Sequence, residues 1–147
     1  MPIPNPVPAG ASGAPASAAD AALLAVPVLG DAASDSLSDL PGLDAAASGA
    51  IEDARSSGAF RGKRRETFET VLTGDGWRAS RILLVGAPPG PEGLASRLRE
   101  AAAVAARVGR ARRVPRLAFV CRGEAERVEL AQAAAEGIVT GGFADTR

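Results

Sequence analysis

Histidine is absent from this sequence of 147 residues, and cysteine and lysine each occur only once. Without histidine the chain cannot form a Cys/His zinc site, a Cys–His nucleophile pair or a Ser-His-Asp triad. The single cysteine, Cys121, provides no disulfide framework, and its place in an apolar run fits a reducing compartment. The missing residue types therefore exclude these three classes of catalytic or metal site.

The sequence also lacks a secretory signal and a membrane-spanning segment. Residues 1–19 are rich in Pro, Ala, Gly and Ser, without the basic and continuous apolar segments of a signal peptide. Such a composition buries too little apolar surface to order itself, so we expect a flexible tail over residues 1–19. No apolar run approaches the roughly 20 residues of a membrane helix. These features predict a cytoplasmic protein with no membrane partner.

The charge of the chain is balanced overall but uneven along its length. The formal net charge is zero, which gives no general attraction to nucleic acid or acidic membranes. Residues 1–55 carry seven acids and one base, whereas residues 61–122 carry fourteen bases and five acids. An anionic partner would therefore meet the middle of the chain.

Hydrophobic periodicity predicts seven elements that alternate between strands and helices. Short apolar or alternating runs predict strands, and the Asp75-Gly76 pair between two of them indicates a hairpin. Helical spacing predicts three helices, with Ser38 or Asp39 as a cap and with Gly58 and Gly109 as stop signals. The predicted strands are 22–29, 66–72, 80–87 and 116–121, and the predicted helices are 40–57, 91–110 and 123–139.

This order of elements predicts an α/β fold with a mixed, mainly parallel sheet and helices on both faces. The hairpin supplies one antiparallel pair, and the helical crossovers make the other strands parallel. Pro27 lies within the first strand and removes a ladder donor. We therefore expect a neighbouring strand to end beside Pro27, or that side of the strand to face outward.

Two basic clusters are the candidate contacts for anions or nucleic acid. One precedes the second strand and the other follows the second helix; they comprise Arg61, Lys63, Arg64 and Arg65, and Arg110, Arg112, Arg113 and Arg116. Phosphate contact is one interpretation of such clusters. The simpler interpretation is a solvated loop and favourable charge near a helix C-terminus. The absence of interleaved aromatic residues favours the simpler interpretation.

The segment GAPPGPEG, residues 86–93, lies between a strand and a helix, where phosphate-binding loops occur. Pro88, Pro89 and Pro91 have no backbone N–H to offer a phosphate, and no standard nucleotide motif is present. The acid pairs Glu52/Asp53 and Glu124/Glu126 have no converging histidine or other partner. We therefore predict no catalytic, cofactor-binding or metal-binding residue in this chain.

Four stretches in order resemble the N-terminal domain of the leucyl (cytosol) aminopeptidase family. They cover the chain from about residue 19 to its C-terminus. The second contains a Leu-Pro-x-Leu-Asp helix start followed by a Gly-x-Phe-x-Gly-Lys turn, and the third is similar to the family's Arg-Val-Leu-Leu-Val-Gly strand. The stretches are ADAALLAVPVLG, LPGLDAAASGAIEDARSSGAFRGKRRET, SRILLVGAPPG and AAAEGIVTGGFADTR.

The resemblance implies a macro-domain-like fold over residues 20–140, followed by a truncated interdomain segment at 141–147. Family members are peptidases that hold two divalent metal ions, Zn or Mn, in a C-terminal domain that we expect to be missing here. The implied function is that of a non-catalytic domain for packing and assembly. Its partners would be a catalytic aminopeptidase domain or further copies in a homo-oligomer, and the chain alone would be inactive.

Two alternative functions remain open at this stage. A macro-like fold is compatible with a module that binds a nucleotide or ADP-ribose near residues 86–93. Some bacterial members of the family bind DNA, which keeps open a weak DNA-binding domain acting through the arginine clusters.

Overall fold

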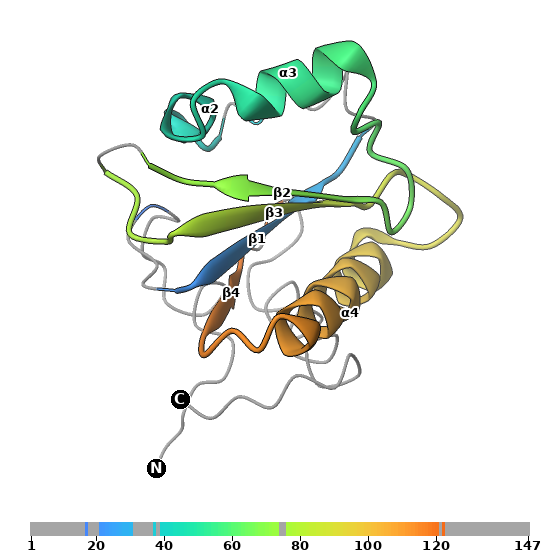
Figure 1. The fold of residues 1–147 in the computed structure, drawn as a ribbon. Helices are drawn as coiled ribbons and strands as arrows, with labels where there is room; N and C mark the ends of the chain where they lie inside the picture. The colour runs from blue at the N-terminus through green and yellow to red at the C-terminus, as the bar shows by residue number, and fades with distance from the viewer. Residues whose placement is uncertain are drawn as a thin grey trace.

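A computed structural model describes residues 17, 21–30, 37, 39–73, 76–120 and 122 of the chain. Its central feature is a four-stranded sheet with helices on both faces (Figure 1). The strands are β1 (Leu23–Val28), β2 (Thr67–Val71), β3 (Arg81–Gly86) and β4 (Leu117–Phe119). The helices are α2 (Leu43–Ala46), α3 (Ala50–Ser57) and α4 (Leu94–Ala111).

The sheet has the order β2-β3-β1-β4. β1 pairs in parallel with β3 and with β4, whereas β2 pairs antiparallel with β3. These pairings confirm the predicted mixed, mainly parallel sheet and its one hairpin. Asp75 itself lies outside the described residues, and β4 is shorter than the predicted strand 116–121.

All six residues of β1 are buried, including Pro27. β4 ends at Phe119, opposite Ala25, and the N–H of Val120 donates to the Ala25 carbonyl. Alternate residues of a strand direct their polar groups to the same side, so Pro27 faces the space beyond the end of β4. This confirms that a neighbouring strand ends where proline cannot donate.

The single helix predicted over residues 40–57 is wrong, because the chain forms two short helices there. Ser48 and Gly49 have left-handed backbone angles, with φ of 58° and 78°, and such residues end a right-handed helix. The predicted cap is also wrong: the N-cap residues are Gly42 and Gly49, and neither has a capping side chain. Instead, the Glu52 N–H in the first turn of α3 donates to Asp44 Oδ1 at 3.0 Å.

The helix α4 confirms the predicted element but ends later than expected. Gly109 is buried inside the helix, and Arg113 adopts the left-handed conformation beyond its end, with φ of 57°. The N–H of Val114 donates to the Gly109 carbonyl, and the N–H of Arg113 donates to the Arg110 carbonyl. This pair of bonds is the Schellman motif, here built on arginine rather than glycine.

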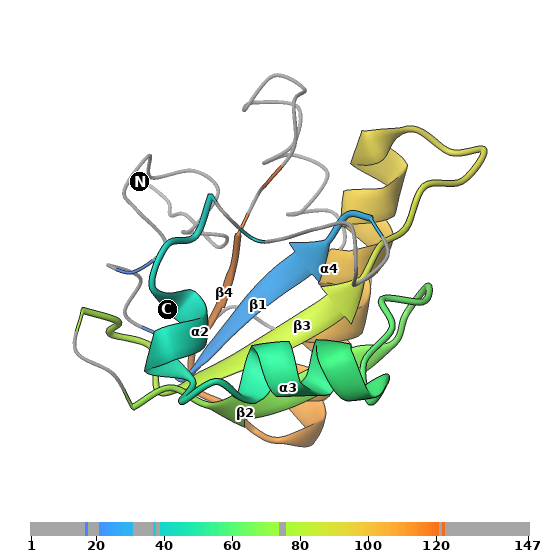
Figure 2. The same ribbon diagram turned by 90° about the horizontal axis from the view of Figure 1, so that it is seen from above.

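Two apolar cores lie on the two faces of the sheet, because successive strand residues point to opposite sides. Leu24 and Val26 face α2 and α3, which lie across the sheet in Figure 2, and Phe60 is buried in the same apolar cluster. Leu23 and Ala25 face α4, where Leu98 is buried. Ala101 and Ala105 are buried beside Leu98, so α4 presents an apolar face to this side of the sheet.

Several predictions fall on residues that the structure does not describe. These are the helix at 123–139, the segment at 141–147 and, apart from Ser17, the tail at 1–19. The Ser17 carbonyl accepts a hydrogen bond from the N–H of Arg78.

Candidate functional site

The first basic cluster lies on a turn that packs against the end of β3. The Glu66 side chain closes this turn by accepting hydrogen bonds from the N–H groups of Arg61 and Lys63. The backbone of the turn also pairs with Gly86, which accepts from the Arg65 N–H and donates to the Glu66 carbonyl. A Cβ added at Gly86 would lie 1.9 Å from the Lys63 carbonyl oxygen, so only glycine allows this approach.

This turn carries Arg64 and Arg65 to the side of α4. Arg64 Nε lies 2.6 Å from Glu100 Oε1, and Arg65 Nη2 lies 2.9 Å from Glu100 Oε2. Arg64 also pairs with Glu92 at 3.3 Å. The hydrogen bond from Arg64 lowers the pKa of Glu100, against the opposing effect of desolvation, and the same bond raises the pKa of Arg64.

The loop that follows β3 and the basic turn that precedes β2 line one groove. A hollow of about 570 Å³ lies between the turn at 64–65, the loop at 87–92 and one side of α4. Five arginines and two glutamates contribute to its lining. The loop and the basic turn lie about 20 residues apart in the sequence and were predicted as separate candidates. Packing of the turn against Gly86 brings them together. The lining residues include Arg64, Arg65, Pro88, Ser96, Arg97 and Arg107.

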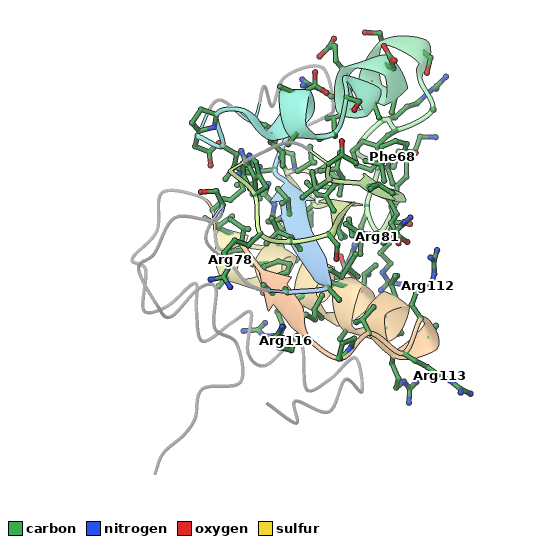
Figure 3. All side chains as sticks on the ribbon, turned by 60° about the vertical axis from the view of Figure 1, so that its left-hand side comes forward. Phe68, Arg78, Arg81, Arg112, Arg113 and Arg116 are labelled. Atoms are coloured by element: carbon green, nitrogen blue, oxygen red, sulfur yellow. The ribbon has the colours of Figure 1, made fainter. Side chains whose placement is uncertain are left out.

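The second basic cluster does not form one continuous surface. Arg112 turns back toward the sheet and pairs with Glu69 of β2 at 2.9 Å, and Arg81 binds the same carboxylate at 2.6 Å (Figure 3). Arg113 points away from the body of the molecule, and Arg116 lies well apart from both (Figure 3). Arg110 lies exposed in the last turn of α4 and does not line the groove, which reaches along the helix as far as Arg107.

Two further arginines bind main-chain carbonyls at the ends of the strands, and sequence reasoning missed both. Arg97 Nη2 donates to the carbonyls of Leu29 and Ala87, at 2.5 and 2.8 Å. Arg122 is buried, donates to the Pro27 carbonyl at 2.6 Å and holds Asp39 with two bonds of 2.9 and 2.7 Å. The available signal for Arg122 was a charge directly after an apolar strand, on the side where Pro27 leaves an open edge.

Within the described residues, no group of three or more His, Cys, Asp or Glu side chains could hold a metal ion. None of the described helices is long and apolar enough to cross a membrane. The chemistry available in this part of the chain is therefore cationic: guanidinium groups that bind carboxylates, carbonyls or an added anion.

Comparison with known proteins gives matches of two kinds. The sequence model described as "Cytosol aminopeptidase family, N-terminal domain" matches residues 25–147. Among solved structures, a mutant of tomato leucine aminopeptidase has a similar fold, with a TM-score of 0.64 and 23% sequence identity. The similarity covers 88% of this chain and 27% of that chain, so this chain spans about a quarter of its length. No curated protein sequence matched.

Proposed function

This chain belongs to the cytosol aminopeptidase family through its N-terminal domain, and from that premise we propose that it is a non-catalytic domain that packs against an aminopeptidase catalytic domain and supports assembly. The observation that carries the proposal is the family match itself, which is to the N-terminal domain and spans residues 25–147. In this proposal the two divalent metals, zinc or manganese, and the peptidase chemistry belong to the catalytic domain, and the compartment is the cytoplasm.

The contacts of the described charged residues support a structural role. Arg97 and Arg122 bind main-chain carbonyls, and Glu69 and Glu100 are held between pairs of arginines. A general acid or base needs a position from which it reaches a substrate proton, and these side chains are instead directed at their own fold.

The first experiment is an assay of the purified chain with Leu-p-nitroanilide in the presence of Mn²⁺ or Zn²⁺. We expect no turnover above the metal-only blank. Robust hydrolysis that follows the protein through purification would overturn the non-catalytic role.

The second experiment tests packing directly. The chain is mixed with a leucyl aminopeptidase catalytic domain that lacks its own N-terminal domain, and complex formation is followed by light scattering after size exclusion. We expect a defined complex or a defined homo-oligomer of the chain. If the chain stays monomeric and does not bind the catalytic domain, the proposed assembly role is wrong.

The DNA-binding alternative remains a separate prediction. It requires the exposed members of the second cluster, so Arg110→Ala with Arg113→Ala should weaken a salt-dependent association with duplex DNA. Binding that is unchanged by these substitutions would reject this surface.

A further inference from the structure

The segments that follow β1 and β3 leave the sheet toward opposite faces. The two strands are adjacent and parallel, yet the chain after β1 leads to α2 and α3 on one face, whereas the chain after β3 leads to α4 on the other (Figure 1). In open α/β sheets, such a divergence leaves a crevice outside the carboxyl ends of the strands, where ligands bind. The groove begins at Ala87, directly after β3, and Arg97 in its lining reaches the Leu29 carbonyl directly after β1.

Arg97 occupies the crevice and carries a charge that no described carboxylate neutralises. Its Nε and Nη2 groups donate to the carbonyls of Ala87 and Leu29, which are neutral acceptors just beyond β3 and β1. The side chain is partly buried, where a cation without a counter-ion is costly. An anion that enters the groove would supply the missing negative charge.

The rest of the groove adds guanidinium donors rather than backbone donors. Pro88, Pro89 and Pro91 offer apolar surface but no N–H, so an anion must be held by side chains. Glu100 and Glu92 use only part of Arg64, and Glu100 uses only part of Arg65, since each guanidinium has five N–H donors. Glu100 thus holds both arginines against α4 while leaving donors for a ligand.

We propose that this groove binds a small phosphorylated molecule, with the arginine side chains around Arg97 as its ligands. Its volume of about 570 Å³ is of the size that encloses a nucleotide-sized molecule. A phosphate monoester suits the site because its oxygens accept from several guanidinium groups at once. The apolar proline wall leaves room for an uncharged body attached to the phosphate. This site does not depend on the proposed packing function.

The experiment is calorimetric titration of the chain with AMP and with inorganic pyrophosphate, using adenosine as the uncharged control. We expect both phosphates to bind with a Kd of about 1 mM or tighter, with weaker binding at higher salt, and adenosine alone not to bind. Absence of heat with both phosphates at about 10 mM would overturn the proposal.

Ser96→Glu tests the location without removing a structural arginine. Ser96 lines the groove in the first turn of α4, where an added carboxylate stabilises the helix but repels an anion in the groove. We expect phosphate binding to weaken about tenfold or more. Ala95→Glu adds the same charge in the same turn outside the groove lining and should leave most of the binding intact.

Equal loss of binding in the two variants would show a diffuse charge effect and overturn the groove as the site. A single-stranded oligonucleotide serves as a further probe. If it binds more tightly than AMP and Ser96→Glu leaves its affinity unchanged, the groove is overturned as the site in favour of a nucleic-acid surface elsewhere. Thermal unfolding of each variant confirms that the compared proteins are folded.

Discussion

Gly86 shows how one residue without a side chain places the candidate site. The turn that carries Arg64 and Arg65 lies so close to β3 that a Cβ would meet the backbone of Lys63 at 1.9 Å. The hydrogen bonds between Gly86 and the backbone of Arg65 and Glu66 exist because of this approach. The groove along α4 thus depends on a residue that does not line it.

Gly86→Ala should therefore destabilise the fold by about 3 kcal/mol, because the contact is with backbone that cannot rotate away. Chemical denaturation of the variant measures this loss. Gly90→Ala is the matched control, since its Cβ would meet only the movable end of Glu92 and should cost less than about 0.5 kcal/mol. Equal stability of the two variants would contradict the close approach.

Arg113 holds a position that glycine would occupy with less strain. Its φ of 57° lies in the left-handed region, which costs an L-residue about 1–2 kcal/mol. Arg113→Gly should raise the free energy of unfolding by about 1 kcal/mol after the added entropy of the unfolded chain is subtracted. Arg110→Gly, inside the same last turn, should instead lower it by about 1 kcal/mol. A stability loss in both variants would show that Arg113 is not strained.

At the scale of elements, α2 and α3 form a unit in which one helix caps the next. The two helices together span only part of the predicted 40–57 helix, and Asp44 in α2 supplies the acceptor that the N-cap Gly49 lacks. The prediction of one helix over 40–57 was wrong because helical periodicity does not report that Ser48 and Gly49 leave the helical conformation. A polar residue followed by glycine was the signal for that break.

Asp44→Ala should destabilise the protein by about 1 kcal/mol through loss of this cap. Asp44→Asn keeps an oxygen acceptor and should retain most of the stability. Asp53→Ala removes an acid from the same first turn of α3, where no described side-chain hydrogen bond is lost, and should cost less. Similar losses in Asp44→Asn and Asp44→Ala would indicate charge rather than capping.

The turn at 61–66 and α4 are joined by Glu100, and this contact depends on pH. Because the folded-state pKa of Glu100 is lowered, its stabilising contribution is present above the unfolded-state pKa and is lost as pH falls through the folded value. The difference in unfolding free energy between the wild type and Glu100→Gln should therefore be largest near neutral pH and shrink below about pH 4.5. A pH-independent difference would contradict the ionic contact.

At the scale of the whole molecule, Arg122 joins three distant parts of the chain. It follows β4, binds the Pro27 carbonyl in β1 and pairs with Asp39. The proline that leaves an open edge in β1 and the arginine that fills the space lie 95 residues apart in the sequence. The end of the parallel sheet is thus closed by a side chain rather than by another strand residue.

Arg122→Met should destabilise the protein by about 2 kcal/mol, because it leaves the Pro27 carbonyl without a donor. The stability of Arg122→Lys should lie between that of the wild type and that of Arg122→Met, since an ammonium group keeps the charge but not the fork of donors. Arg107→Met, at an exposed position of α4, should change stability by less than about 0.5 kcal/mol. An unchanged free energy of unfolding in Arg122→Met would show that water replaces the guanidinium at no cost.

The sequence by itself determined the α/β class, the four strands, the hairpin and the long helix α4, and the ordered motifs identified the family. These features depend on local periodicity and on turn residues, which act over a few positions. Only the tertiary structure decided which charges are neutralised. Glu69 joins Arg81 to Arg112, Glu100 joins Arg64 to Arg65, and Arg97 and Arg122 bind strand carbonyls. Electrostatic contacts depend on distance in space rather than along the chain, so the candidate groove became visible only after folding brought β3, the 61–66 turn and α4 together.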